Sequence, residues 1–307
     1  MNILEITTCF YGHLRNYGMP VWVLSPLRRI IRIIANRVLP KYLSREVIYA
    51  SERRDGLIVS FTSFPARIED VWKVVECLKR QTILPEKIIL WLSKKQFPEH
   101  DMIPDSLWSR KDNLFEIRLV DDDIRSHKKY FYVMQEYPKK DFITCDDDIF
   151  YDPYMIERLI KTSEKYPGCI IANHTSHIRI TDDNELLPYA TWRDNEEPFA
   201  SSDRLQIGVG GVLYPNGTLH EMVLRKDLFM QLAPMADDIW LNAMARLQGT
   251  KVVQSGKAFI TLEITNNSPS LCSINNGIKN MNDIQTQNIR RYFLENGIKD
   301  VYATQLS

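Results

Sequence analysis

The sequence lacks an excess charge, a cysteine framework and a long apolar run. Its 39 Lys and Arg residues balance 39 Asp and Glu residues, which argues against a nucleic-acid-binding protein, because such proteins usually carry a basic excess. Its five cysteines include no CxxC pair, which excludes a common zinc site and disfavours a disulfide framework. We therefore expect a reducing compartment.

Targeting segments are also scarce. Residues 1–20 contain Cys, His, Arg and Asn where a secretory signal would be apolar. No apolar run reaches the ~18 residues of a transmembrane helix. The 307 residues, 44% of them hydrophobic and 25% charged, are typical of a soluble globular protein with one large or two modest domains. We expect a cytoplasmic location.

Residues 20–43 are basic and apolar, unlike the rest of the chain. The segment reads PVWVLSPLRRIIRIIANRVLPKYL and contains no acid, which predicts an amphipathic helix with a cationic face. Such a helix suits an anionic membrane surface, and the protein would then lie peripherally on the inner face of the cell membrane. The alternative is a helix packed on the main domain with its arginines in water. We assign residues 1–55 to this segment and 56–307 to the main domain.

From Leu57 onward, short apolar runs alternate with amphipathic helices. This alternation predicts an α/β fold, in which a mixed, mostly parallel sheet carries helices on both faces. The expected strands are 57–61, 87–92, 115–120, 141–145, 169–172, 251–253 and 258–263. The expected helices are 68–80, 128–136, 152–166, 237–248 and 284–295. Residues 174–206 are expected to be irregular.

Three consecutive aspartates, Asp146, Asp147 and Asp148, directly follow the apolar strand at 141–145. The carboxyl end of a strand is where open α/β folds bind their ligands. Three carboxylates repel one another unless a cation offsets their charge. Mg²⁺ or Mn²⁺ with oxygen ligands is the natural partner, and such ions commonly bridge carboxylates to a diphosphate. The alternative is an acidic turn in which one Asp caps the next helix.

A second acidic motif, Asp237 and Asp238, precedes the helix at 237–248. A carboxylate here could accept a proton from a hydroxyl nucleophile. Alternatively, the pair serves only as a helix cap and first turn, where the helix dipole favours acids. Trp240 on the same helix either stacks on an acceptor sugar or belongs to the core.

Smaller motifs could complete a binding site. Gly210 and Gly211 lie in a glycine-rich segment, GVGGVLYP, which either lets the backbone approach a sugar or forms a structural turn. After the first strand, Thr62 and Ser63 could bond a base or ribose and Arg67 could pair with phosphate. Lys129 could neutralise a diphosphate, or it is a solvated surface lysine.

Taken in order, SFTSFPARI, IILWLS, a lysine before ITCDDDIFY, then GVGGVLYP and DDIW resemble one family. The chain resembles the GT-A glycosyltransferases, specifically the family-2-like enzymes of bacterial capsule and lipopolysaccharide synthesis, over roughly residues 56–249. Two departures concern the nucleobase site and the metal shell. The sequence after the second strand is Trp91-Leu92-Ser93, where the family often carries aspartates, and no histidine follows His220.

The resemblance implies a GT-A fold, a nucleoside-diphosphate sugar donor and a divalent Mn²⁺ or Mg²⁺ ion. Asp146 and Asp148 would handle metal and ribose, with Asp147 between them, and Asp238 would be the base. The implied reaction transfers a sugar, with inversion, to a glycan or lipid-linked acceptor held near Asp237. Two alternatives stay open: a haloacid-dehalogenase-like phosphatase, and a catalytically inactive membrane-associated protein that uses the GT-A fold only for binding.

Overall fold

The computed structural model describes residues 2–45, 52–192, 199–256, 260–265 and 280–303. Its helices are α1 (Ile3–Gly12), α2 (Val21–Leu43), α3 (Val71–Leu78), α4 (Asp105–Trp108), α5 (Lys128–Glu136), α6 (Met155–Lys165), α7 (Lys226–Leu232), α8 (Asp237–Gln248) and α10 (Met281–Glu295). Its strands are β1 (Glu52–Thr62), β2 (Ile83–Ser93), β3 (Phe115–Val120), β4 (Asp141–Thr144), β5 (Ile149–Phe150), β6 (Ile170–Ala172), β7 (Thr175–His177), β8 (Arg204–Gln206), β9 (Val212–Tyr214), β10 (Val252–Gln254) and β11 (Leu262–Glu263).

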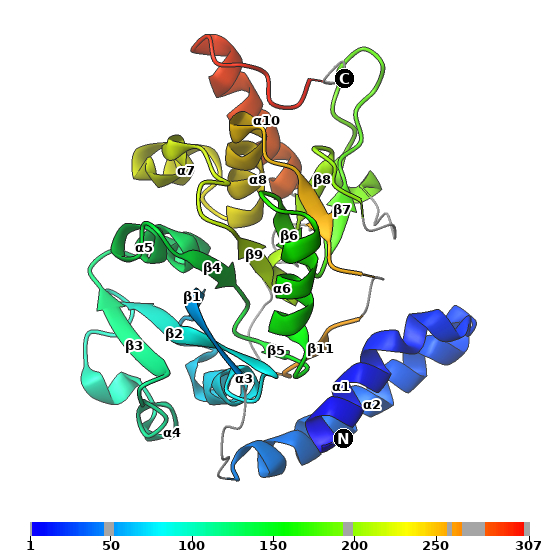
Figure 1. Ribbon diagram of the computed structural model, residues 1–307, viewed down its shortest axis with the longest axis vertical. Helices are drawn as coiled ribbons and strands as arrows, with labels where there is room; N and C mark the ends of the chain where they lie inside the picture. Colours follow the sequence, from blue (N-terminus) through cyan, green and yellow to red (C-terminus); the bar gives the residue numbers. More distant parts are fainter. Residues whose placement is uncertain (1, 46–51, 193–198, 257–259, 266–279, 304–307) are drawn as a thin grey trace.

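Seven strands form the central sheet in the order β10-β6-β9-β4-β1-β2-β3 (Figure 1). Every neighbouring pair is parallel except the two that involve β9, which runs antiparallel to β4 and β6. Two small antiparallel pairs, β5 with β11 and β7 with β8, stand outside it. The predicted fold class is confirmed: this is a mixed, mostly parallel α/β sheet, consistent with a Rossmann-like GT-A fold.

The sheet separates two apolar cores because successive side chains of a strand point to opposite faces. In β1, Val59 and Phe61 join the core that contains α3 and α6, whereas Ile58 joins the core that contains α5, α7 and α8. Both faces of the strand are therefore buried, which explains its almost continuous apolar run. The result is a sheet covered by helices on both faces, as predicted.

Several expected elements are confirmed, and others are missed. The predicted ranges of β3, α5 and α8 match the structure residue for residue. β9, in contrast, lies within the segment expected to be a turn, and β7 and β8 lie within the stretch expected to be irregular. Each of these strands has only three residues, too few for a pattern of alternation to be visible in the sequence.

The amino-terminal residues form a helical hairpin beside the sheet. The predicted amphipathic helix is α2, and α1, which the sequence did not predict, lies alongside it near β5 and β11 (Figure 1). Leu4, Leu14 and Leu39 are fully buried in the same core as α3 and α6. One face of the hairpin is thus packed on the main body. None of the helices described is long and apolar enough to cross a membrane.

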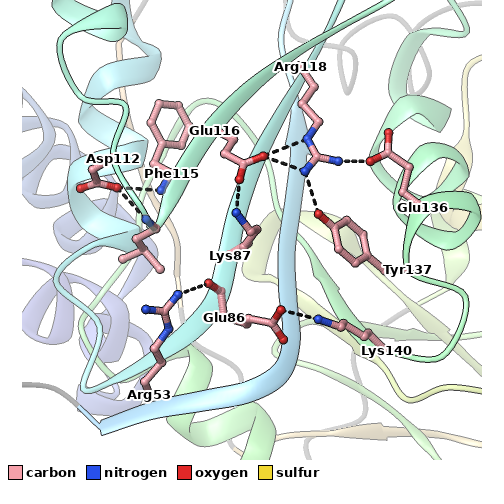
Figure 2. A network of polar contacts seen from close by, with 11 residues as sticks. Arg53, Glu86, Lys87, Asp112, Phe115, Glu116, Arg118, Glu136, Tyr137 and Lys140 are labelled. Carbon is pink, nitrogen blue, oxygen red and sulfur yellow. Dashed lines mark hydrogen bonds and ion pairs between the residues drawn. The ribbon is translucent and has the colours of Figure 1, made fainter.

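A ladder of charged side chains lies along β2 and β3 and reaches the end of α5 (Figure 2). Glu116 pairs with Lys87 and, at 2.7 Å, with Arg118. Arg118 also donates to the Tyr137 hydroxyl at 2.7 Å and pairs with Glu136 at the end of α5. Charges on an edge strand such as β3 discourage pairing with other chains. They also fix α5 against the sheet.

The start of α5 is held by His127, which is fully buried. Its Nε2 donates to the Ala233 carbonyl at 2.8 Å, and its Nδ1 accepts from the Tyr130 hydroxyl at 2.9 Å. Its ring stacks on Phe229 with centroids 4.4 Å apart. Burial lowers the pKa of His127 from 6.5 to about 4, because the charged imidazolium would lose its hydration.

We predict that His127 makes the protein acid-sensitive. Since the folded pKa is depressed, the stabilisation is complete above the unfolded pKa of 6.5 and is lost as the pH falls from 6.5 toward 4. Between about pH 7.5 and about pH 5, His127 should account for roughly 2 kcal/mol of lost unfolding free energy. Urea titrations of wild type and His127→Gln at both pH values measure this difference. If the variant loses as much stability as wild type, His127 is not responsible.

Candidate functional site

The candidate site lies at the carboxyl ends of β1 and β4. From β1 the chain continues to β2 and β3 on one side, and it returns to place β4 on the other side. This reversal creates a switch point, where the loops after the two strands diverge and open α/β sheets bind ligands. The loop after β1 supplies Ser63 and Arg67, and the loop after β4 supplies the three aspartates. The starts of α5 and α8 face the same place, through Lys129 and Asp238 respectively.

Each member of the triplet Asp146–Asp148 contacts a cation. Asp146 pairs with Lys129 of α5. The Nη1 atom of Arg67 lies 2.8 Å from Asp147 Oδ1 and 2.8 Å from Asp148 Oδ2. Asp147 also accepts a hydrogen bond from the Ser63 hydroxyl. The triplet is therefore part of a connected charge cluster.

The second acidic motif joins this cluster. Lys129 Nζ lies 3.9 Å from Asp237 Oδ2, so one ammonium group connects the triplet with the start of α8. Gly208 marks the point where the motifs meet, since its N–H donates to Asp238 Oδ2 at 3.1 Å. A Cβ built on this glycine would lie 3.2 Å from Asp238 Oδ1 and 3.7 Å from Asp146 Oδ1. Carboxylates that are 92 residues apart in the sequence thus approach one point.

Asp237 and Asp238 are not the cap of α8. Ala236 is the N-cap residue, and both aspartates lie in the first helical turn. Asp238 is partly buried. Its pKa is raised well above 3.8, first by burial and then by repulsion from Asp237. A partly accessible carboxylate with a raised pKa is suited to accept a proton from a bound hydroxyl.

Negative charge exceeds positive charge in this cluster. Five carboxylates, those of residues 146–148, 237 and 238, contact or approach two cations, Arg67 and Lys129. The pKa of Asp148 rises to about 7, mainly through burial and then through repulsion from Asp146 and Asp147. Such a site gains stability from an added cation.

A second aspartate triplet gives a useful contrast. Asp121, Asp122 and Asp123 follow β3 and pair with the exposed Lys94, the exposed Lys95 and the buried Lys128. Hydrogen bonds from Lys226 and Lys95 lower the pKa of Asp122, and the hydrogen bond from Lys128 lowers that of Asp123 despite its burial. Lysines thus balance the negative charge of this triplet, whereas the cluster that contains the triplet after β4 has more carboxylates than cations.

The donors after β4 fit a hard divalent cation in their chemistry. Asp146 and Asp148 offer carboxylate oxygens, and their side chains are 27% and 21% exposed, against 7% for Asp147. Mg²⁺ and Mn²⁺ prefer oxygen ligands of this kind. Within the described residues, no group of three or more His, Cys, Asp or Glu side chains is arranged to hold a metal ion. In the structure Arg67 and Lys129 engage the carboxylates instead.

Three of the predicted nucleotide contacts have partners within the chain. Arg67 was predicted to bind phosphate, but it is buried and pairs with Asp147 and Asp148. Thr62 was predicted to bond a base or ribose, but it is buried and its hydroxyl donates to the Trp91 carbonyl at 2.7 Å. Lys129, predicted to meet a diphosphate, is no solvated lysine: it is buried between the two acidic motifs.

The predicted acceptor contacts are corrected in part. Trp240 is fully buried, and its indole N–H donates to the Val223 carbonyl at 3.1 Å, so it belongs to the core. A Cβ on Gly210 would lie 2.2 Å from His174 Cδ2, and a Cβ on Gly211 would lie 2.8 Å from Met155 Sδ. These two glycines are therefore required by close packing. Asp237 remains at the site, where its Oδ2 lies 3.9 Å from Lys129 Nζ.

One further side chain at the site, Tyr151, was missed, and Ser63 has a different partner from the one expected. The Tyr151 hydroxyl accepts from the Asp146 N–H at 2.8 Å and donates to the Val209 carbonyl at 3.2 Å, so it ties the triplet to the glycine-rich segment. Ser63 holds Asp147. Ser63 was expected, like Thr62, to bond a base or ribose, but its partner is a carboxylate of its own chain, 84 residues away. The contact follows only from the pairing of β1 with β4, which places the loop after β1 beside the triplet.

No protein-family model and no curated protein matches the sequence. Solved structures that resemble the fold include an apo UDP-glucose pyrophosphorylase, at 9% identity and a TM-score of 0.40 over 80% of this chain and 99% of that one. A CMP:2-keto-3-deoxy-manno-octonic acid synthetase bound to CTP reaches 12% identity and 0.39 over 66% and 89%. A 4-diphosphocytidyl-2C-methyl-D-erythritol synthase reaches 10% and 0.38 over 77% and 98%. At these values the likenesses support no conclusion about activity.

We predict that Arg67 is needed for folding. Arg67→Met leaves the buried Asp147 and the partly buried Asp148 without their guanidinium, which should cost about 3–5 kcal/mol of unfolding free energy. Arg54→Met is the matched control, because it breaks an exposed pair with Glu164 that should be worth at most about 1 kcal/mol. Urea denaturation measures both variants. Equal losses would contradict the assignment, as would an Arg67→Met protein of unchanged stability.

We also predict that position 211 requires glycine for two reasons: the backbone has a positive φ, and a Cβ would clash with Met155. Gly211 and Gly217 both have positive φ, +90° and +82°, but a Cβ meets Met155 only at Gly211. Gly217→Ala should therefore cost about 1–2 kcal/mol through backbone strain alone. Gly211→Ala should cost about 1–3 kcal/mol more through overpacking. Thermal or urea unfolding compares the two. A smaller effect at Gly211 than at Gly217 would refute this explanation.

Proposed function

We propose that the protein is a metal-dependent glycosyltransferase that moves a sugar from a nucleoside-diphosphate sugar to a hydroxyl of a glycan or lipid-linked acceptor. The observation that carries the proposal is the meeting of two carboxylates at one point. Asp146, from the partly exposed triplet, and Asp238, from the start of α8, both approach Gly208 at the switch point of the sheet. The order of the motifs along the chain, which resembles that of GT-A glycosyltransferases, adds support.

Asp146 and Asp148 would hold the divalent ion, because they are the more exposed oxygen donors of a cluster in which carboxylates outnumber cations. When bound, the ion would neutralise the negative charge that develops on the departing diphosphate. Asp147 is left to its structural contacts with Arg67 and Ser63. Lys129 keeps its positive charge between the triplet and α8, since carboxylates on both sides raise its pKa.

Asp238 would act as the base. It would take the proton of the acceptor hydroxyl while the hydroxyl oxygen forms a bond to the anomeric carbon. The bond from that carbon to the diphosphate oxygen breaks, and its electron pair leaves with the nucleoside diphosphate. A single displacement of this kind inverts the anomeric configuration. The Gly208 N–H fixes the orientation of the Asp238 carboxylate.

The first experiment tests the donor. The protein is incubated with Mn²⁺ or Mg²⁺ and a panel of sugar nucleotides, and the release of nucleoside diphosphate and the shift in Tm are measured. Metal-dependent release, with stabilisation by the same nucleoside diphosphate, is the expected result. Three results would overturn the proposal. They are release of pyrophosphate from a nucleoside triphosphate and a sugar phosphate, release of phosphate from phosphomonoesters, and nucleotide binding without turnover.

We predict that substitutions in the two acidic motifs have different effects, one on the rate of the chemical step and the other on nucleotide binding. Asp238→Asn should lower kcat by about 10²–10⁴-fold, as loss of a general base does, and should leave nucleotide affinity unchanged. Asp148→Asn should abolish metal-dependent nucleotide binding and turnover together, because it removes an oxygen ligand. Steady-state kinetics and calorimetric titration with Mn²⁺ and nucleoside diphosphate measure both effects.

Asp121→Asn is the control, since its side chain is 86% exposed and belongs to the triplet after β3. It should change neither property. Equal loss of nucleotide binding in Asp238→Asn and Asp148→Asn would contradict the separate roles of the two motifs.

A further inference from the structure

The hairpin of α1 and α2 carries a row of large apolar side chains on its outer surface. In α2, Trp22 is 78% exposed, and Ile30, Ile33 and Ile34 are 45–55% exposed. In α1, exposed residues recur at helical spacing, with Ile3, Ile6 and Phe10 38–49% exposed. The opposite side of α2, with Ala35, Leu39 and Leu43, is buried. The packed face thus accounts for only part of the hairpin's apolar surface.

Basic side chains are mixed with these apolar residues. Arg29, Arg37 and Lys41 are exposed on α2. At 100° per residue Arg37 and Lys41 fall among the three isoleucines, and Arg29 lies at the edge of this face, one turn before Ile33. Residues 2–45 contain seven Lys and Arg but a single acid, Glu5, in a chain whose overall charge is zero. That acid accepts a hydrogen bond from the Tyr154 hydroxyl at 2.7 Å. The hairpin is therefore a strongly basic part of a neutral protein.

We propose that the outer face of α1 and α2 binds the surface of an anionic lipid bilayer. The helices would lie in the plane of the interface, with the isoleucines in the outer acyl region and the arginines at the phosphates. Trp22, at the start of α2, has the amphipathic ring that favours the headgroup level. A second copy of the chain is a poorer occupant, because a symmetric contact would bring two arginine-rich faces together without acids to pair them.

The hairpin is also connected to the candidate site. Arg32 pairs with Glu263 of β11 at 2.7 Å, and Asn36 donates to the Glu263 carbonyl at 3.0 Å. The next residue, Ile264, donates its N–H to the Asp148 carbonyl at 2.7 Å. A membrane-bound α2 would thus hold the acid triplet at a fixed height above the lipid. If the proposed glycosyl transfer is correct, this position favours a lipid-linked acceptor; the membrane binding itself does not depend on that function.

Vesicle sedimentation with the full chain tests this proposal without any activity assay. The protein should sediment with phosphatidylcholine vesicles containing about 30% phosphatidylglycerol, and much less with pure phosphatidylcholine. Added salt should weaken the binding, because part of it is electrostatic. Failure to sediment with the anionic vesicles, or equal binding to both, would overturn the proposal.

Two double variants test the face itself. Ile33→Ser with Ile34→Ser should lower the partition coefficient at least about tenfold through lost apolar burial. Arg29→Gln with Arg37→Gln should lower it by about fivefold for each arginine. The matched controls are Ile284→Ser with Leu294→Ser on α10, and Lys94→Gln with Lys95→Gln, all exposed positions away from the hairpin. The controls should bind as wild type does.

Sedimentation velocity distinguishes the alternative occupant. Wild type without lipid should remain a monomer at the concentrations used for the vesicle assay. A dimer that is lost in the Ile33→Ser and Ile34→Ser variant would assign the face to a second copy and overturn the lipid proposal. Unchanged vesicle binding in both hairpin variants, with circular dichroism showing intact helices, would overturn it as well.

Discussion

The placement of Lys129 between two acidic motifs is the interaction on which the candidate site depends. Its ammonium group is buried, pairs with Asp146 and lies 3.9 Å from Asp237. Without a cation at this position, carboxylates from β4 and α8 would face one another in a poorly hydrated place, at a high electrostatic cost. The fold must therefore bring the start of α5 to the ends of β4 and α8 at once. The backbone supports this position, since the Ser60 hydroxyl of β1 bonds the Lys129 carbonyl.

Sheet topology explains why these groups can meet. β4 lies between a parallel neighbour, β1, and an antiparallel neighbour, β9. The loop after β1 therefore lies next to the triplet, and the segment that enters β9 also arrives at this edge of the sheet. That segment contains Gly208, whose N–H holds Asp238. A single antiparallel strand in a mostly parallel sheet thus adds a third source of site residues to the two that a parallel switch point would supply.

The sequence predicted elements well where periodicity was long, and predicted contacts poorly where a partner was distant. The nine residues of α5 and the twelve of α8 show their helical period, and both were found with correct bounds. The triplet was also located correctly, because an apolar strand leads directly into it. The partner of Arg67 was not, because a sequence does not distinguish an arginine that meets a ligand's phosphate from one that meets a carboxylate of its own chain 80 residues away.

Local ambiguity accounts for the remaining errors. Gly210 and Gly211 signal a close approach, but what approaches is His174 and Met155 and not a sugar. Trp240 follows two site aspartates in the sequence, yet the helical turn rotates its ring into the core against Val223. Helix α1 escaped detection because its apolar residues are interrupted by Thr7, Thr8 and Cys9. For the glycines and Trp240, the residue type was informative, but the sequence did not show which part of the molecule each residue faces.

The two aspartate triplets show which physical property separates a binding site from a charged surface. Both Asp121–Asp123 and Asp146–Asp148 follow a strand at the same edge, and their sequences are identical. After β3, each aspartate pairs with a lysine, and hydrogen bonds from lysines lower the carboxylate pKa values of Asp122 and Asp123. After β4, burial and mutual repulsion dominate, and the pKa of Asp148 rises to about 7. The requirement for an added cation therefore arises from the surroundings of a triplet and not from the motif itself.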